Sequence, residues 1–231
     1  MSICAEEKKE PKLVLNNICK NFGGVVAASD ICLDIYGGET MGLIGPNGAG
    51  KTTLMYTLAG LETPQEGKVM IDGTDIYALS ATARSVFRNR NMGFIFQNYL
   101  LMPELTALEN ACLASSIGRR PRVEYVRELM ERVGLSHRLN HLPSELSGGE
   151  QQRVAIARAL ANDAPIIFAD EPTGNLDGRT SQDVLGLLKV TSQKFSQTIV
   201  MITHNEEIAQ LAHRIVRIAV SYTHLTLPTK L

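Results

Sequence analysis

Residues 40–52 read Thr40-Met-Gly-Leu-Ile-Gly45-Pro-Asn-Gly-Ala-Gly-Lys51-Thr52, and this stretch decides the fold. The run Thr40–Ile44 predicts a short buried strand, and Lys51–Leu61 predicts a helix, with a glycine-rich loop between them. Gly48 and Gly50 let backbone N–H groups turn inward around an anion, and the start of the helix adds partial positive charge. This order of elements predicts an α/β sheet with a phosphate-binding loop at its edge.

The loop matches the pattern GxxxxGK(S/T) at every fixed position. Lys51 is predicted to contact the β- and γ-phosphates of a nucleoside triphosphate, and the Thr52 hydroxyl is predicted to ligate Mg²⁺. The motif alone predicts a P-loop nucleoside triphosphatase and nothing narrower. The alternative, a glycine-rich turn with a surface lysine, leaves the complete match unexplained. The residues predicted to hold the nucleotide here are Gly45, Pro46, Asn47, Gly48, Ala49, Gly50, Lys51, Thr52 and Thr53.

A second apolar strand ends in two acids, in the sequence Ile166-Ile-Phe-Ala-Asp170-Glu171. The carboxyl ends of parallel strands are where α/β sheets bind ligands, so both carboxylates are expected beside the phosphate loop. Asp170 is predicted to hold Mg²⁺, directly or through water, and Glu171 to act as general base toward the attacking water. The alternative role for Asp170 is to cap the next turn, with Pro172 as a stop.

Composition limits the function classes. The chain has 231 residues, enough for one domain, and 23 Lys and Arg balance 24 Asp and Glu to give a net charge of −1. Such a chain has no global electrostatic reason to bind nucleic acid. The four scattered cysteines predict reduced thiols. No apolar run reaches the ~18 residues that span a bilayer, and residues 1–12 lack the apolar core of a secretion signal. We therefore expect a cytoplasmic protein. If it serves a membrane, we expect it to do so through a partner.

Strand-like and helix-like segments alternate along the chain, which predicts a mainly parallel sheet with an N-terminal antiparallel β subdomain. From about residue 98 to 160 the pattern becomes helical, with an amphipathic stripe over Val123–Val133, and predicts an inserted helical subdomain. The remaining predicted strands are Leu13–Leu15 and Ala28–Ile35 around a Gly23-Gly24 turn, Lys68–Ile71, Asn91–Phe96, Pro165–Ala169, Thr198–Thr203 and Arg214–Ala219, with a further helix over Ser181–Val190.

Residues 146–151 read Leu-Ser-Gly-Gly-Glu-Gln, which resembles the signature motif of ABC ATPases. Ser147 and Glu150 also form a capping-box pattern that predicts a helix start. Two glycines in a first helical turn cost stability, and they make sense where the backbone must closely approach a phosphate. The resemblance implies a P-loop NTPase core and a head-to-tail homodimer, in which each ATP lies between the phosphate loop of one subunit and Ser147, Gly148 and Gly149 of the other.

Four further positions match the ABC ATPase pattern in order. By resemblance, Phe22 stacks on adenine, Gln97 senses Mg²⁺ and water, Asp177 belongs to the loop that crosses the dimer, and His204 holds the γ-phosphate. A core phenylalanine in a strand is a serious alternative for Phe22. The resemblance spans residues 13–219 as one ATPase domain, after an N-terminal extension of residues 1–12.

Residues 93–110 and 169–177 resemble one bacterial group of ABC ATPases, which includes lipoprotein-releasing subunits, macrolide and antimicrobial-peptide exporters, and a cell-division ATPase. This resemblance implies an integral membrane permease partner, and an ATPase that drives export or lipoprotein release from the cytoplasmic side of the inner membrane. The alternatives are a cell-division complex, a soluble non-transport ABC ATPase and a P-loop phosphotransferase. The apolar cluster Tyr99–Leu105 is expected either to dock the permease or to pack inside the helical lobe.

The final residues, 220–231, follow Arg214–Ala219 without a turn signal. They resemble the translation of a sequencing adapter, and we therefore expect a non-native tail outside the fold and a missing native C-terminus. The alternative is a genuine terminal strand, since Tyr222 and the alternation of Thr and Leu have good β propensity.

Overall fold

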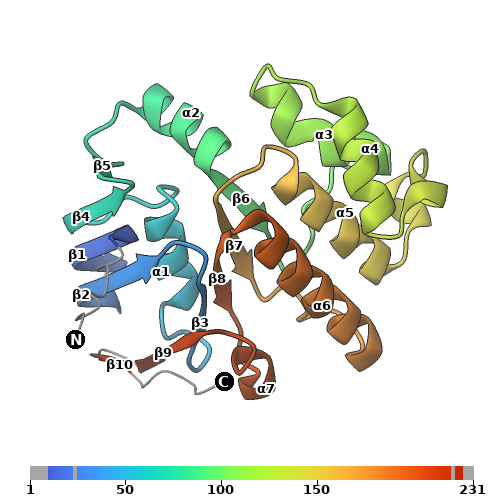
Figure 1. Cartoon of the computed structure of the whole chain (residues 1–231). Coiled ribbons are helices and arrows are strands. Elements are labelled where there is room, and N and C mark those ends of the chain that lie inside the picture. Colours follow the sequence, from blue (N-terminus) through green and yellow to red (C-terminus); the bar gives the residue numbers. More distant parts are fainter. Residues whose placement is uncertain (1–9, 23–24, 220–221, 226–231) are drawn as a thin grey trace, which may run out of the picture.

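The computed structural model describes residues 10–22, 25–219 and 222–225, and these form two sheets with helices around them (Figure 1). The antiparallel sheet has the order β2-β1-β4-β5, and the second sheet has the order β10-β9-β3-β8-β7-β6. The strands are β1 (Pro11–Phe22), β2 (Val25–Tyr36), β3 (Thr40–Ile44), β4 (Glu66–Ile71), β5 (Thr74–Asp75), β6 (Met92–Ile95), β7 (Ile166–Asp170), β8 (Thr198–Ile202), β9 (Arg214–Ala219) and β10 (Tyr222–Leu225). The helices are α1 (Lys51–Leu58), α2 (Ala81–Asn91), α3 (Ala107–Ile117), α4 (Val123–Arg132), α5 (Gly148–Leu160), α6 (Gly178–Phe195) and α7 (Glu206–Ala209), with 3₁₀ turns at Ser136–Arg138 and Pro143–Glu145.

The second sheet is parallel from β9 to β6, which confirms the predicted α/β class. Successive side chains of a strand point to opposite faces of the sheet. In the central strands β7 and β8, the side chains on both faces are buried, each face in a different core. Ile167 and Met201 face a core shared with α3, α4, α5 and α6, here called the helical-side core. Phe168 and Val200 face a core shared with α1 and the antiparallel sheet, here called the hairpin-side core. The two cores therefore place α1 and α5 on opposite sides of the sheet (Figure 1).

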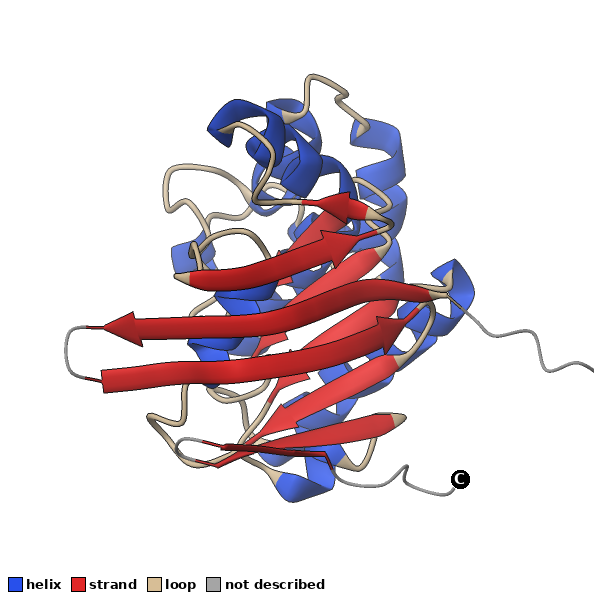
Figure 2. Cartoon of the chain, turned by 90° about the vertical axis from the view of Figure 1, so that its left-hand side faces the viewer, coloured by secondary structure: helices blue, strands red, loops and turns tan. Residues whose placement is uncertain are grey.

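The antiparallel sheet is built on the long strands β1 and β2, which run side by side across the face seen in Figure 2. Both strands extend beyond the predicted runs. Register shifts interrupt their pairing, and Asn17 and Asp30 adopt positive φ of 51° and 50°. Such bulges bend and twist a strand without ending it. The predicted turn at residues 23–24 lies outside the described residues, although the adjacent Phe22 pairs with Val25.

The helical lobe between β6 and β7 holds α3, α4 and α5, as predicted. On α4 the predicted stripe is buried at Val126, Leu129 and Met130, whereas Val123 at the start of the helix is 40% exposed. Helix α2 was not predicted, and the reason is visible in its packing, because none of its residues is buried. Among the described residues, every helix is too short or too polar to span a bilayer.

The segment Tyr99–Leu105 combines the two predicted environments. Leu101 packs partly buried against the helical-side core, while Leu100 and Met102 are 57% and 48% exposed. The segment therefore has an inner anchor and an apolar outer surface.

At both ends of the chain, the first and last strands begin or end at other residues than the sequence predicts. Residues 1–9 of the predicted N-terminal extension lie outside the described residues, and Pro11 already belongs to β1. At the other end, Tyr222–Leu225 pairs antiparallel with β9, which is the arrangement that the terminal-strand alternative predicts. The expectation that residues 220–231 lie outside the fold is corrected for these four residues, while the non-native origin of the tail stays a prediction.

Candidate functional site

The candidate site lies where β3, β6, β7 and β8 end. These strands are parallel neighbours, so the loops that follow them meet at one edge of the sheet. The sequence places the phosphate loop after β3, Gln97 after β6, Asp170 and Glu171 at the end of β7, and His204 after β8. Topology alone therefore brings together the phosphate loop, Gln97, Asp170, Glu171 and His204, while Phe22, Ser147–Gly149 and Asp177 belong to other parts of the chain.

The phosphate loop is shaped by glycines. Gly48 and Gly50 have φ of 81° and 85°, in the left-handed region that glycine adopts without steric cost. A Cβ on Gly50 would lie 2.2 Å from the Ala27 carbonyl oxygen, and a Cβ on Gly45 would lie 2.3 Å from the Ile218 carbonyl oxygen. The loop is thus packed tightly between β2 and β9 and allows no side chain at these two positions.

Lys51 opens α1 and is only 6% exposed. Its Nζ donates hydrogen bonds to the carbonyl oxygens of Gly45 (2.8 Å) and Pro46 (2.9 Å). These two bonds aim the ammonium group into the loop instead of toward bulk water. A phosphate oxygen that enters the loop would therefore meet a partly desolvated positive charge.

Thr52 and Asp170 form the candidate magnesium site. The Thr52 hydroxyl donates to Asp170 Oδ1 at 3.4 Å. Burial raises the pKa of Asp170; Glu171 adds to this shift, and the Thr52 hydrogen bond and the charge of Lys51 oppose it. Mg²⁺ prefers oxygen ligands, and a cation here would offset the cost of burying the carboxylate. The residues fit the ion that the sequence predicts.

Glu171 adopts a positive φ of 43°, a conformation that costs a residue with a side chain about 1–3 kcal/mol. Its Oε1 lies 3.1 Å from Nδ1 of His204, so the two predicted catalytic side chains are in contact. A Cβ on Gly174 would lie 2.9 Å from Gln97 Nε2 and 3.2 Å from Glu171 Oε2. Gly174 therefore leaves room for the Gln97 amide and the Glu171 carboxylate to share one corner of the site.

The predicted helix start at Ser147 is present. Ser147 is the N-cap of α5 and forms the full capping box, in which the Glu150 backbone N–H donates to Ser147 Oγ (3.3 Å) and the Ser147 N–H donates to Glu150 Oε2 (2.8 Å). That backbone hydrogen bond is the main reason why the pKa of Glu150 lies below its ordinary value. A favourable cap thus fixes the first turn of α5.

The two glycines that follow Ser147 have a packing role that the sequence did not suggest. A Cβ on Gly148 would lie 2.9 Å from the Tyr99 hydroxyl, and a Cβ on Gly149 would lie 2.4 Å from a methyl carbon of Thr180. The close approach of α5 to its neighbours is therefore one reason for these glycines, beside the predicted approach to a phosphate.

Asp177 is the N-cap of α6. Its side chain accepts hydrogen bonds from the backbone N–H groups of Arg179 and Thr180, both at 3.1 Å, and from the Thr180 hydroxyl at 2.7 Å. The hydroxyl bond is the leading cause of a lowered pKa for Asp177. These contacts explain the residue structurally, and its predicted role at the nucleotide stays a prediction.

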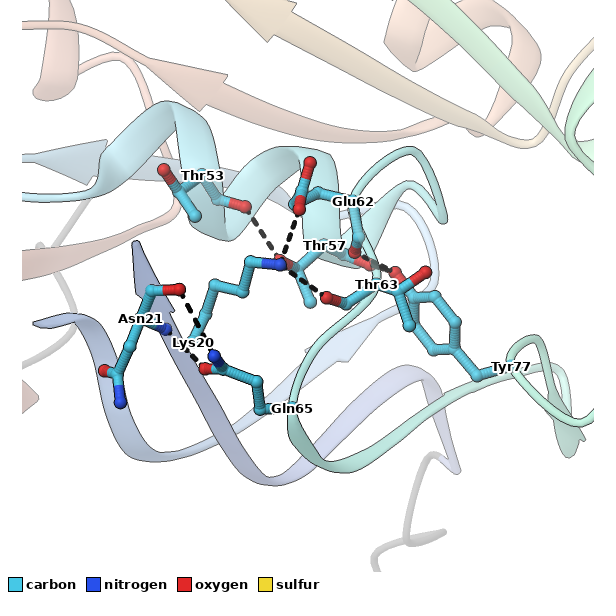
Figure 3. A network of polar contacts seen from close by, with 8 residues as sticks. All are labelled: Lys20, Asn21, Thr53, Thr57, Glu62, Thr63, Gln65 and Tyr77. Carbon is cyan, nitrogen blue, oxygen red and sulfur yellow. Dashed lines mark hydrogen bonds and ion pairs between the residues drawn. The ribbon is translucent and has the colours of Figure 1, made fainter. Parts of the chain in front are cut away.

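The end of β1, which carries Phe22, is fastened to the loop after α1 (Figure 3). Lys20 Nζ pairs with Glu62 at 2.5 Å, and the Asn21 backbone exchanges hydrogen bonds with the side chain of Gln65 at 2.5 and 3.3 Å. This network fixes the backbone beside Phe22 relative to the helix that begins with Lys51. The adenine contact predicted for Phe22 stays a prediction, since its side chain lies outside the described part.

Three residues in the surroundings of the site escaped prediction. Gln152 of α5 is fully buried and donates to the Pro172 carbonyl oxygen at 2.6 Å, just after Glu171. Arg158 and Asn175 bind the loop that follows Gln97. Their partners lie 20 to 78 residues away along the chain, so no local pattern signals these contacts.

The position of the site defines the class of protein. A phosphate loop and an acidic pair that follow parallel strands of one sheet identify a P-loop nucleoside triphosphatase. The family described as ABC transporter matches residues 28–174, and the chain belongs to this family. The predicted ATP-binding and ATP-hydrolysing domain of the ABC class is therefore confirmed.

Individual relatives show which members of this family the chain is similar to. The chain is 44% identical over 211 residues, 87% of this chain and 93% of the relative, to the lipoprotein-releasing system ATP-binding protein LolD of Pseudomonas syringae pv. tomato. It is 41% identical to the protein of the same name from Bacteroides fragilis, with 87% and 94% of the two chains covered.

Solved structures agree with this placement. The dimeric bacterial ABC transporter cassette MJ0796 is similar with a TM-score of 0.83 and 37% identity, over 89% of this chain and 94% of that chain. A dimeric post-hydrolysis state of MJ0796 bound to ADP and phosphate gives a TM-score of 0.84 and 36% identity, over 92% and 98% of the two chains.

Proposed function

We propose that this chain is the ATP-hydrolysing subunit of an ABC transporter that releases lipoproteins, and that it works with integral membrane permease subunits on the cytoplasmic side of the inner membrane. The observation that carries the proposal is the 44% identity to LolD proteins over most of the chain, and the position of the residues predicted to hydrolyse ATP at one sheet edge supports it. The identity favours lipoprotein release over macrolide export, peptide export and cell division.

The geometry supports a direct hydrolysis mechanism. Lys51 and the N–H groups of the phosphate loop bind the β- and γ-phosphates, and Thr52 and Asp170 would hold the magnesium ion. When bound, Mg²⁺ supplies positive charge that offsets the charge of those phosphates. Glu171 accepts a proton from water as the water oxygen attacks the γ-phosphorus, the bond to the bridging oxygen breaks, and ADP and phosphate form. His204, 3.1 Å from Glu171, orients this carboxylate and faces the γ-phosphate.

Two subunits are proposed to share each nucleotide in a head-to-tail, ATP-dependent dimer. Helix α1, with Lys51, packs on the hairpin-side core, whereas α5, with Ser147 at its start, packs on the helical-side core. One γ-phosphate bound by α1 is therefore an unsuitable ligand for the start of α5 in the same chain. The dimeric cassettes among the similar structures support an arrangement in which a second copy supplies Ser147–Gly149.

The permease is proposed to dock beside Gln97. Leu100 and Met102 are exposed there. A cavity of about 370 Å³ is not involved, because it is lined by α6, β8 and residues 210–213, which do not border this segment. The nearer cavity, of about 330 Å³, lies between α2, β6 and α3 and includes Phe96 and Ile117, the latter 69% exposed. This apolar surface next to a hydrolysis residue is suited to coupling ATP turnover to a membrane partner.

Purification and reconstitution test the proposal. A tagged copy should co-purify with a multi-span membrane protein, and the complex in proteoliposomes should release a lipid-modified protein only with Mg-ATP. The matched control is the same complex with Glu171→Gln, which should assemble and release nothing. ATP-dependent export of a macrolide or peptide, without lipoprotein release, would contradict the assignment.

A further inference from the structure

The loop after Gln97 contains an unusual kink. Tyr99 and Leu100 are consecutive residues with positive φ, 59° and 47°, and neither is glycine. This left-handed conformation is unfavourable for residues that carry a side chain. The Leu100 N–H also donates to the Asn98 carbonyl oxygen at 2.5 Å, which closes a tight turn. Contacts from outside the loop must therefore hold the kink in place.

Arg158 of α5 supplies such contacts. Its two terminal nitrogens donate hydrogen bonds to the carbonyl oxygens of Tyr99 and Leu100, each at 2.6 Å. Burial lowers the pKa of this guanidinium, and within the described residues no carboxylate forms an ion pair with it. The rigid fork of an arginine matches two adjacent carbonyl oxygens, which a lysine cannot bind in the same way. Among the described residues, the side chain of this partly buried arginine thus has hydrogen-bond partners in the two kinked residues alone.

The other side of the loop is held by Asn175, which follows the catalytic segment of β7. Its Nδ2 donates to the Gln97 carbonyl oxygen at 3.0 Å and to Asn98 Oδ1 at 3.1 Å. The backbone of Gln97 is therefore fixed directly by Asn175 and, through the kink, by Arg158. The Gln97 amide is set in the corner at Gly174 that it shares with the carboxylate of Glu171.

We propose that Arg158 is a positioning residue that holds the Tyr99–Leu100 kink and thereby orients the side chain of Gln97 for hydrolysis. The proposal rests on the proposed function and on the role that the sequence predicts for Gln97, which is to sense Mg²⁺ and water. Arg158 lies on the same 13-residue helix that begins after Ser147. A displacement of that helix when Ser147 meets the nucleotide of a second copy would move the kink, and the two nucleotide-contacting segments would be mechanically linked.

Kinetics of the full chain test this role. Arg158→Gln removes the two hydrogen bonds to the kink, and we expect the affinity for Mg-ATP to be unchanged. The kcat should fall on the order of tenfold to hundredfold, because small misplacements of reacting groups slow a reaction by this much. The Mg²⁺ concentration that gives half of the maximal rate should rise. Adding Leu100→Gly should restore much of the rate, because glycine adopts the left-handed conformation without steric cost. Leu100→Ala is the matched control, since it removes the same side chain without favouring that conformation, and it should not restore the rate.

Three outcomes separate this proposal from the one on which it rests. If Gln97→Ala hydrolyses ATP at the wild-type rate, the role of Gln97 and the positioning role of Arg158 are both overturned, while the proposed function stands. If Gln97→Ala is impaired while Arg158→Gln retains wild-type kcat and Mg²⁺ dependence, only the role of Arg158 is overturned. Should Arg158→Gln fail to fold, Arg158→Lys carries the same comparison, and equal rates for its double variants with Leu100→Gly and Leu100→Ala would overturn the positioning role.

Discussion

Lys51→Ala tests the phosphate loop through the strength of two hydrogen bonds. In the structure Lys51 is 6% exposed, and its ammonium group donates to two carbonyl oxygens at 2.8 and 2.9 Å. We expect the ammonium group to donate to two phosphate oxygens when ATP binds. Hydrogen bonds that involve a charged group contribute about 1.5–3 kcal/mol each, so two contribute roughly 3–6 kcal/mol. This loss corresponds to a dissociation constant for Mg-ATP raised by about 10² to 10⁴-fold.

Isothermal titration with Mg-ATP measures the affinity, and release of phosphate measures the rate, which should fall below detection. Lys68→Ala is the matched control, because Lys68 lies exposed on β4, away from the site, and its removal should change neither quantity. A thermal melt shows whether each variant is folded. Near-normal turnover or affinity in a folded Lys51→Ala protein would refute the assignment of the loop.

Three further predictions concern the packing around the site. Gly149→Ala should lower the free energy of unfolding by about 1–3 kcal/mol, because the new methyl group meets α6 at 2.4 Å. Gly186→Ala, in open space on α6, should instead raise it by about 0.5–1 kcal/mol, and denaturant titration of both measures the difference. Glu150→Gln should cost about 1 kcal/mol at neutral pH by weakening the capping box. Since the pKa of this carboxylate is lowered from 4.5, its stabilisation is present above that value and is lost as the pH falls through the lowered pKa, so variant and wild type should converge in acid. Met102→Glu should leave the isolated subunit folded and its ATPase activity intact but uncouple it from transport, whereas Leu101→Glu should destabilise the fold, as melting curves would show.

The parts of the fold that the sequence predicted are those in which local pattern and tertiary role agree. Strand β3 and the loop after it follow from an apolar run and fixed glycines, and the bounds Thr40–Ile44 match the structure. A helix begins after Ser147 because both residues of its capping box, Ser147 and Glu150, lie within four residues of sequence. Asp170 and Glu171 end a strand whose burial on both faces gives a continuous apolar run.

The parts that escaped prediction either lack an apolar stripe or depend on distant contacts. Helix α2 buries none of its residues, so it has no apolar stripe for a periodicity argument to find. The left-handed kink at Tyr99 and Leu100 contradicts local preference and is held by Arg158, 58 residues beyond Leu100. The packing role of Gly149 in α5 depends on its contact with Thr180 in the neighbouring helix α6. For the kink and for Gly149, the deciding partner is visible only after folding.

The central claim is that Glu171 is the base of a site completed by a second copy of the chain. In Glu171→Gln the side chain keeps nearly the same shape but cannot accept the proton, so a loss of about 10²–10⁴-fold in rate is expected while nucleotide binding survives. ATP then stays bound, and the equilibrium between monomer and dimer shifts toward the dimer, because ATP contacts both subunits only in the dimer. Size-exclusion chromatography with and without Mg-ATP should show a dimer only with nucleotide, and the dimer should vanish when Ser147→Arg is added. A Glu171→Gln protein that stays monomeric with ATP demonstrably bound would contradict the account.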